Sequence, residues 1–308
     1  LSVVLACTQV RNGSKGRIIH GLIVENDLEL NVAIGSSLIR MYTTCGCLPE
    51  AHQIFDRLQD RDIISWGAIM AGYMEHGQCQ RVINLYSRMQ DEDFRHEVDR
   101  VILMNLLGAC SGIGDIRLGR KIHDQVMLWN DVLLFDDVDV GNAFVNMYVK
   151  CGSLKDAHRM FDHIPTRNLV AWGAMIAGYV THGDTFKAFQ CFKQMQEEGV
   201  QPNEWTFSIV FQACCMLLDK EEAFVVVNQS IKVFSLKIVQ ALHQDVRRNG
   251  LHSNVFIGSR LVSTYGKCGS IVEAENVFQG LQHPDAIAWS AMMAAYVEVG
   301  DGERALQL

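Results

Sequence analysis

The sequence predicts an all-α protein, a right-handed α-solenoid built from tandem helix–turn–helix repeats. Three observations predict this fold. Segments of the chain resemble one another in a fixed order, which is the signature of a repeat array. Apolar residues within each segment recur at helical intervals. Only four of the 308 residues are proline, which leaves room for uninterrupted helices.

The repetition is clearest in three segments that begin at Val32, Val138 and Val255. They read VAIGSSLIRMYTTCGCLPEAHQIFDRLQDRD, VDVGNAFVNMYVKCGSLKDAHRMFDHIPTRN and VFIGSRLVSTYGKCGSIVEAENVFQGLQHPD. Four kinds of residue stand in matching columns, namely Gly35, Gly141 and Gly258; Tyr42, Tyr148 and Tyr265; Cys45, Cys151 and Cys268; and Phe55, Phe161 and Phe278. The common spacing of these columns shows that the three segments are copies of one structural unit.

Two further types of unit complete the pattern. A second type reads IISWGAIMAGYMEHG from Ile63, LVAWGAMIAGYVTHG from Leu169 and AIAWSAMMAAYVEVG from Ala286. A third type begins at Arg100 and Glu204, and the opening LSVVLACTQVRNGSKGRIIH is the tail of the same type. The predicted units are residues 1–31 (partial third type), 32–62 (first), 63–99 (second), 100–137 (third), 138–168 (first), 169–203 (second), 204–254 (third), 255–285 (first) and 286–308 (partial second).

Each unit is predicted to hold two short helices. Leu38, Met41 and Tyr42 lie at i, i+3 and i+4, which places them on one face of a helix. Gly46 then ends that helix, and a second apolar stripe leads to Phe55. Two helices this short cannot bury their apolar faces alone, so we expect neighbouring pairs to stack into a continuous core.

Two units depart from the pattern. The unit that starts at Ile63 carries extra residues near Asp93 to His96, and the unit that starts at Glu204 has an insertion at about 215–240. The insertion has two interpretations: an extra helix in the array, or an artefact of splicing or of the gene model. Either one makes the local stacking irregular.

The composition excludes several classes of protein. Hydrophobic residues make up 49% and charged residues 20%, which indicates a folded chain. The ten cysteines suit reduced thiols in an intracellular compartment, since the chain is long and shows no signal peptide. No run of eighteen apolar residues predicts a membrane span. Leu1 is not a start methionine and Leu308 falls inside a helical pattern, so we expect a fragment from which any targeting peptide has been lost.

The motifs point to a known family. GNAFVNMYVKCGSLKDAHRMFD, LVAWGAMIAGYVTHG and FKQMQEEGVQPN resemble the S and P motifs of the PLS class of plant pentatricopeptide repeat (PPR) proteins, and the third type of unit resembles the L motif. We therefore call the three types S, P and L units. The resemblance covers essentially all of residues 1 to 308. It implies sequence-selective binding of single-stranded RNA, one base per repeat, by the site-recognition module of an organellar RNA-processing factor.

The resemblance also implies a setting for this activity. It implies C-to-U editing as the process, and the mitochondrion or the chloroplast as the location. It implies single-stranded organellar RNA as the partner, with organellar editing-factor proteins in trans as further candidates. It implies no cofactor, no membrane and no small-molecule substrate.

The resemblance carries base-reading roles onto particular residues. The fifth residue of a unit's first helix and the last residue of the unit form each reading pair, and the pairs are Ser36 with Asp62, Gly67 with Asp99, Asn142 with Asn168, Gly173 with Asn203, Ser208 with Asn254, and Ser259 with Asp285. The serine–aspartate pairs resemble guanine readers, the asparagine pair a pyrimidine reader and the serine–asparagine pair an adenine reader. Pairs with glycine, and Met104 with Asp137, should discriminate poorly. With RNA read parallel to the chain, we expect a preference of the form G-x-x-Y-x-x-G, and we expect Ser36, Asn142 and Ser259 to face an open groove.

Apolar side chains at the second position of the first helices are expected to clamp the bases. These are Ala33, Ile64, Val101, Val170, Trp205, Phe256 and Ile287, whereas Asp139 breaks the apolar rule. Lys150 and Lys267 occupy the position where family members contact phosphate, and Thr44 replaces them in the first S unit. The net charge of −8 is unusual for a nucleic-acid binder. We expect acidic residues such as Glu50 and Asp156 to lie on the second helices, away from a basic inner face.

Other interpretations of these residues compete with RNA binding. The cysteine and histidine columns suggest a metal site, but repeat packing with buried cysteines explains them better. The column Trp66, Trp172 and Trp289 is expected to be core. The reading serines have an alternative role as helix N-caps. A helical scaffold that binds proteins, as tetratricopeptide arrays do, is the alternative function. The HxE and PCxxC motifs of a zinc deaminase do not occur, so this segment is not expected to be an enzyme, and a C-terminal deaminase (DYW) region is left open for a full-length protein.

Overall fold

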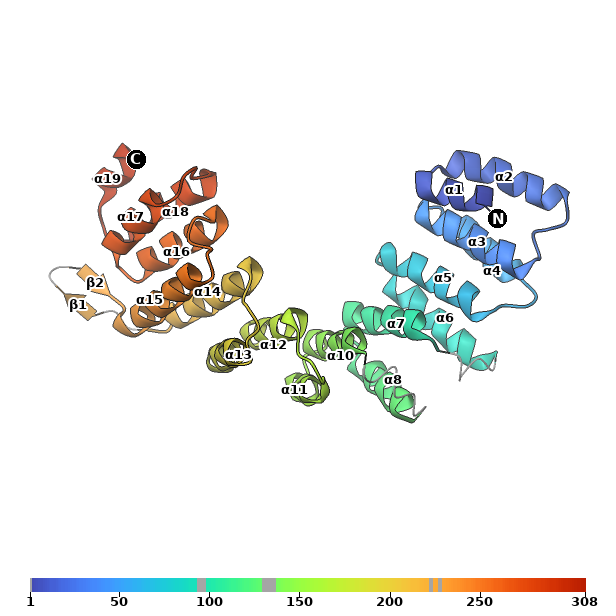
Figure 1. Ribbon diagram of the computed structural model, residues 1–308, viewed down its shortest axis with the longest axis horizontal. Helices are drawn as coiled ribbons and strands as arrows, with labels where there is room; N and C mark the ends of the chain where they lie inside the picture. Colours follow the sequence, from blue (N-terminus) through green and yellow to red (C-terminus); the bar gives the residue numbers. More distant parts are fainter. Residues whose placement is uncertain (1, 93–97, 129–136, 222–223, 227–228) are drawn as a thin grey trace. The chain divides into compact units, whose positions relative to one another are not determined.

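The computed structural model describes residues 2–92, 98–128, 137–221, 224–226 and 229–308. Within these ranges the chain is almost entirely helical, and it divides into two compact units, Leu1–Thr166 and Arg167–Leu308. In each unit antiparallel helix pairs stack side by side (Figure 1). The predicted α-solenoid of helix–turn–helix repeats is therefore confirmed within each unit.

The helix bounds follow the predicted units closely. In the compact unit Leu1–Thr166 the helix pairs are α1 (Ser2–Val10) with α2 (Gly13–Glu25), α3 (Val32–Thr44) with α4 (Leu48–Arg57), α5 (Ile63–Glu75) with α6 (Cys79–Asp91), α7 (Arg100–Ile113) with α8 (Ile116–Leu128), and α10 (Val138–Lys150) with α11 (Leu154–His163). In the second they are α12 (Leu169–Thr181) with α13 (Thr185–Glu197), α14 (Glu204–Leu218) with α15 (Val233–Arg248), α16 (Val255–Lys267) with α17 (Ile271–Gln279), and α18 (Ala286–Glu298) with α19 (Gly302–Gln307).

Gly46 ends the first helix of its unit, as the sequence predicted. Its φ of +76° is the left-handed conformation that glycine adopts without strain. The N–H of Cys47 reaches back to the carbonyl of Tyr42 over 2.8 Å, and that of Gly46 bonds the carbonyl of Thr43 over 3.0 Å. This is the Schellman arrangement, which satisfies two carbonyls at the helix end.

The recurring aromatic residues form the core between neighbouring pairs. Trp66 and Trp172 are completely buried, and the ring of Phe55 meets Trp66 edge to face at 4.7 Å between centroids. Phe278 and Trp289 repeat this contact at 4.8 Å, although Trp289 is partly exposed. The predicted packing role of the tryptophans is therefore confirmed for the two interior copies.

The glycine column marks close contact between a first helix and the loop that follows its partner. A Cβ at Gly35 would lie 2.6 Å from Leu58, and one at Gly258 would lie 2.4 Å from Leu281. A side chain at either glycine would force the end of the facing leucine side chain to move. The glycine column therefore marks a position in each S unit where the first helix and the following loop are in close contact.

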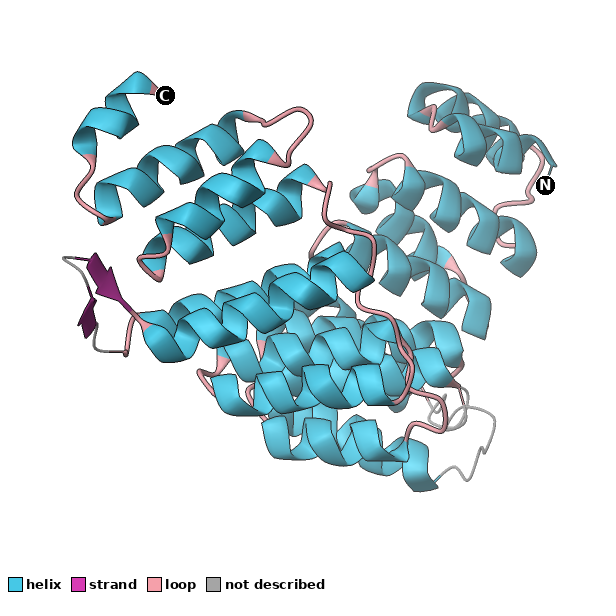
Figure 2. Ribbon diagram, turned by 60° about the vertical axis from the view of Figure 1, so that its left-hand side comes forward, coloured by secondary structure: helices cyan, strands magenta, loops and turns pink. Residues whose placement is uncertain are grey.

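The insertion in the unit that starts at Glu204 forms no additional helix among its described residues. After α14 the backbone makes two short antiparallel strands, β1 (Phe224–Val226) and β2 (Gln229–Ile231), which lead into α15 (Figure 2). The carboxylate of Glu221 accepts the N–H groups of Phe234 and Ser235, so it caps α15. The extra residues predicted near Asp93 to His96 lie outside the described residues.

Candidate nucleic-acid interface

The last residue of each predicted unit caps the first helix of the next one. Oδ1 of Asp62 accepts the N–H of Ser65 over 2.8 Å, and Oδ1 of Asp285 accepts that of Ala288 over 2.8 Å. The same cap recurs throughout, with Asn31, Asp99, Asp137, Asn168, Asn203 and Asn254 as the N-cap residues. One side-chain oxygen of each of these last residues is therefore bonded to the helix that follows.

The second positions of the first helices form a column of exposed side chains. The large apolar residues in this column are between 44% and 64% exposed, and they are Ile64, Val101, Val170, Trp205, Phe256 and Ile287. Ala33 and Asp139 are exposed as well. Because large apolar side chains are usually buried, a regular exposed series of them indicates a surface that binds something.

The fifth positions are much less accessible than the sequence suggested. Ser36 is 6% exposed, Asn142 is 6% and Ser259 is 3%, so the expectation that they face an open groove was wrong. Ser36 and Ser259 each lie between two adjacent first helices, and each of these hydroxyls donates to the carbonyl four residues earlier. The serines are also not N-caps, because asparagine and aspartate hold that position.

One of the serine–aspartate pairs lines a cavity. The cavity between α16 and α18 has a volume of about 400 Å3. Its walls bring together the predicted clamp residues Phe256 and Ile287 with the predicted readers Ser259 and Asp285. Residues from two neighbouring units thus converge on one hollow, as the pairing scheme requires.

In the S unit that starts at Val32, a third side chain occupies the space beside the equivalent pair, Ser36 and Asp62. Ser36 Oγ lies 2.8 Å from Ser65 Oγ, and Ser65 Oγ donates to Asp62 Oδ1 over 2.5 Å. Ser36 Oγ also lies 3.4 Å from Asp62 Oδ1. The predicted partners do meet, but the hydroxyl of Ser65 stands between them. The sequence signal was the departure of Ser65 from the alanine that the other P units carry at this position, Ala171 and Ala288.

The two glycine positions differ in what covers them. At Gly67 an added Cβ would lie 3.8 Å from Val101, an ordinary contact distance. At Gly173 it would lie only 2.3 Å from the ring of Trp205. The indole therefore occupies the space that a reading side chain would need, and its outer part remains exposed. Ser208, the reader predicted for the next unit, is half-buried on α14.

Glu50 and Asp156 lie on second helices as predicted, but aspartates also cap several first helices and Asp139 is exposed at a second position, so acidic side chains occur on both helices of the units. Lys150 and Lys267 end α10 and α16 and are exposed, and neither has an ion-pair partner among the described residues. Glu50 and Asp156 lie on the second helices α4 and α11. Each forms an ion pair with an arginine. Glu50 lies 2.8 Å from Arg17, and Asp156 lies 2.7 Å from Arg120.

Sequence reasoning missed one basic residue at the cavity. The guanidinium of Arg260 lies over the ring of Phe256, 5.6 Å from its centroid. Arg260 lines the cavity and is exposed. Ser37 and Ala143 hold the matching position in the other S units, so no repeat column pointed to it.

The histidine and tyrosine columns bond each other. Nδ1 of His20, His123 and His243 lies 3.0, 2.6 and 3.0 Å from the hydroxyl of Tyr42, Tyr148 and Tyr265 respectively. Burial lowers the pKa of His123, and it lowers that of His243 to about 4. These contacts join the second helix of an L unit to the first helix of the next S unit, which is a packing role.

The cysteines follow two patterns. Cys7, Cys110 and Cys214 are buried, as expected of small apolar side chains. In the other column Cys268 is buried, whereas Cys45 and Cys151 are only half-buried, so the prediction of burial was wrong for those two. Across the described residues, no group of three or more His, Cys, Asp or Glu side chains is placed to hold a metal ion.

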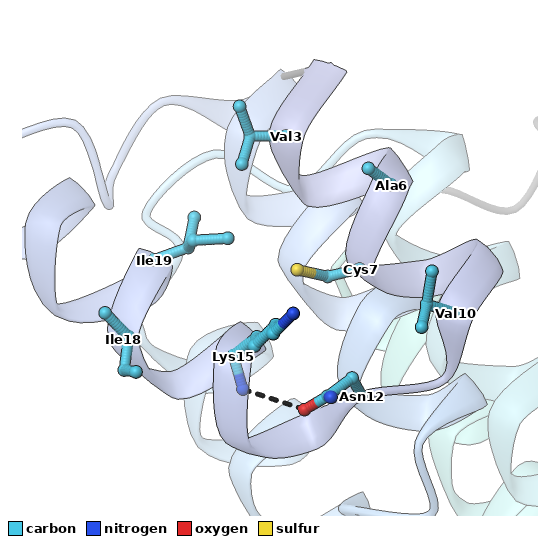
Figure 3. Close-up of a pocket in the computed structure, with 8 residues that line it drawn as sticks. All are labelled: Val3, Ala6, Cys7, Val10, Asn12, Lys15, Ile18 and Ile19. Atoms are coloured by element: carbon cyan, nitrogen blue, oxygen red, sulfur yellow. Dashed lines mark hydrogen bonds between the residues drawn. The ribbon is translucent and has the colours of Figure 1, made fainter.

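A second cavity lies between α1 and α2 (Figure 3). Its volume is about 330 Å3, and its lining is mostly apolar, with Cys7, Val10, Ile18 and Ile19 among the wall residues. None of the predicted reading, clamp or phosphate residues line it.

In the described part of the chain, no helix is long and apolar enough to cross a bilayer.

The fold and the columns define a class of protein, an array of helix pairs with a repeated pattern of exposed second positions. Comparison with known proteins identifies the family. The PPR repeat matches residues 36–63, 64–94, 142–169 and 287–308, and the PPR repeat family matches residues 167–216. The chain belongs to the pentatricopeptide repeat family.

Similar proteins come from Arabidopsis thaliana. The chain is 31% identical over its whole length to pentatricopeptide repeat-containing protein At4g18520, chloroplastic, and covers 46% of that protein. It is 30% identical over its whole length to pentatricopeptide repeat-containing protein At2g46050, mitochondrial, and covers 48% of it. The chain thus spans about half the length of these relatives.

A solved structure shows the same fold. The crystal structure of the pentatricopeptide repeat protein PPR10 in complex with an 18-nt psaJ RNA element matches 94% of this chain and 41% of its own, with a TM-score of 0.67 and 16% sequence identity.

Proposed function

We propose that this chain binds single-stranded RNA with sequence selectivity, and that it is the site-recognition part of an organellar RNA-processing factor. The observation that carries the proposal is the exposed second-position column, because it flanks a cavity lined by Ser259 and Asp285. Flat apolar and aromatic side chains stack on bases of any kind, and polar groups below them distinguish base edges.

The charge pattern supports a modest affinity. The exposed lysines at 150 and 267 are available for phosphate, whereas acidic side chains on the second helices are paired with arginines. Two phosphate contacts on a single strand give a salt dependence with a log–log slope of about −1.4. Base contacts must therefore supply much of the binding.

The L, S and P order of the units supports an editing factor that converts C to U. In this proposal the array selects the site, and the chemistry belongs either to a deaminase region elsewhere in a full-length protein or to a partner, since HxE and PCxxC motifs do not occur in residues 1–308. Organellar editing-factor proteins are the candidate partners in trans. The relatives are named chloroplastic and mitochondrial, which supports one of these two organelles as the location.

A filter-binding titration tests the proposal. The full chain is titrated with a single-stranded RNA that carries G at both outer positions of G-x-x-Y-x-x-G, with a matched RNA that carries C there, and with the duplex of the first. We expect the single strand to bind at least tenfold more tightly than the duplex, because paired bases cannot enter between the clamp residues. Equal affinity for both would favour the protein-binding scaffold instead.

A further inference from the structure

The two complete L units differ from all other units at the first residue of their first helix. That residue is charged in both, Arg100 in α7 and Glu204 in α14. In the remaining units it is apolar, and the residues are Val32, Ile63, Val138, Leu169, Val255 and Ala286. Opposite charges at the same position suggest that what the two share is a contact rather than a charge.

Arg100 contacts the last residue of its own unit. Its Nε donates to Oδ2 of Asp137 over 2.6 Å, and its Nη2 donates to Oδ2 of Asp139 over 2.6 Å. Oδ1 of Asp137 already accepts the N–H of Asp139 over 2.8 Å as the cap of α10. Both oxygens of Asp137 are therefore bonded, and Asp139, which replaces an apolar clamp residue, is held by the same guanidinium.

Glu204 makes the corresponding contact with the donor and acceptor exchanged. Its Oε1 accepts from Nδ2 of Asn254 over 2.6 Å, although 50 residues separate the two in the chain. Oδ1 of Asn254 is bonded as well, because it accepts the N–H of Ile257 over 3.0 Å as the cap of α16. Asn254 is thus also bonded at both of its side-chain polar atoms.

The last residues of four other units keep one atom available. Among the described residues, Oδ2 of Asp62, Asp99 and Asp285 makes no hydrogen bond or ion pair, and neither does Nδ2 of Asn203. Each of these units starts with an apolar residue. A charged first residue therefore coincides with a last residue that is fully bonded.

We propose that Arg100 and Glu204 are locking residues that prevent the last residue of each L unit from reading a base. This inference rests on the proposed RNA binding. A base edge would have to replace a short bond to a charged group, and such bonds are about twice as strong as the neutral bond that a base offers. The L units consequently tolerate any base, and discrimination is left to the S and P units. The lock also overrides the adenine preference that Ser208 and Asn254 imply.

Base discrimination opposite the second L unit tests the lock. Four single-stranded RNAs that differ only at the nucleotide facing Ser208 and Asn254 are titrated with the unsubstituted chain and with Glu204→Ala. We expect the unsubstituted chain to bind the four RNAs within about twofold of one another. Glu204→Ala should prefer adenine by about fivefold, the ratio that one neutral hydrogen bond supplies.

Three control variants separate a lock from a merely structural contact. Glu204→Gln keeps an acceptor for Asn254 but removes the charge, so it should show a preference for adenine that is smaller than that of Glu204→Ala. Asn254→Ala added to Glu204→Ala should abolish the new preference. Leu169→Ala, at the first position of a P unit, should change no preference. Circular dichroism melting establishes that each variant is folded.

The outcomes are distinguishable. Discrimination at this nucleotide by the unsubstituted chain, or equal affinities for Glu204→Ala, overturns the lock while RNA binding stands. A chain that binds none of the single-stranded RNAs overturns the proposed function and the lock together.

Discussion

Two junctions between S and P units carry the same predicted guanine pair and differ in whether it is open. At the junction of α3 and α5, Ser65 places its hydroxyl against Ser36 and Asp62. At the junction of α16 and α18 the same position is Ala288, and the pair Ser259 and Asp285 lines a cavity of about 400 Å3. The hydroxyl of Ser65 occupies one site and has no counterpart in the other, so the identity of a reading pair does not by itself decide whether the pair is available.

The clamp residues differ between these junctions too. The filled one has Ala33 and Ile64 at its second positions, and the open one has Phe256 and Ile287. An aromatic ring offers a base far more stacking surface than a methyl group does. The open junction is therefore expected to contribute more of the affinity than the filled one.

The largest expected effect is the loss of this stacking. Phe256→Ala should weaken RNA binding about tenfold, since stacking on an aromatic side chain is worth about 1–3 kcal/mol per base. The measurement is a filter-binding titration. Phe186→Ala is the matched control, because Phe186 is an exposed phenylalanine on the second helix α13 and should leave affinity unchanged. A similar loss in both variants would mean that the effect is not specific to the junction.

Adding a hydroxyl group at Ala288 and removing the one at Ser65 should exchange the base preferences of the two junctions. Ala288→Ser is expected to reduce the preference for G over C at the open junction about fivefold, because the new hydroxyl can satisfy Ser259 and Asp285. Ser65→Ala is expected to raise the preference for G over C at the filled junction by only about threefold, because Ala33 stacks poorly on a base. Competition titrations with RNAs that differ at one nucleotide measure both. If Ala288→Ser retained full preference for G, the comparison between the two junctions would be wrong.

Much of the fold could be predicted because each element is encoded locally. The helix that ends before Gly46 was visible from its apolar spacing and its glycine, and the burial of Trp66 from its recurrence. The hairpin at Phe224–Ile231 could not be foreseen, because the insertion has no second copy in the chain to compare with. A strand of three residues also gives almost no periodic signal.

The candidate site was less predictable because it depends on how closely neighbouring helices approach. The exposed second positions followed from the repeat register. The burial of Ser36 depends on the distance between α3 and α5, which no residue pattern specifies. The contact between Glu204 and Asn254 joins residues on either side of an irregular insertion. Such contacts are properties of the stacked pairs rather than of any single unit.

The smallest expected effect concerns the histidines behind the two junctions. His20 faces Glu29 at 3.3 Å, whereas His243 has Arg247 nearby and no acid in an ion pair among the described residues. Burial, and then the charge of Arg247, lowers the pKa of His243 to about 4 from an ordinary value of 6.5. The unfolded chain therefore binds the proton more readily, so His243 favours the folded state above pH 6.5, and this contribution is lost as the pH falls toward 4. With solvent screening allowed for, the loss at pH 5 should be about 1 kcal/mol or less. Chemical denaturation at pH 7 and pH 5 measures it, and His243→Gln should show a smaller difference between the two pH values than the unsubstituted chain. An equal difference in both proteins would show that His243 is as easily protonated in the folded chain as in the unfolded one.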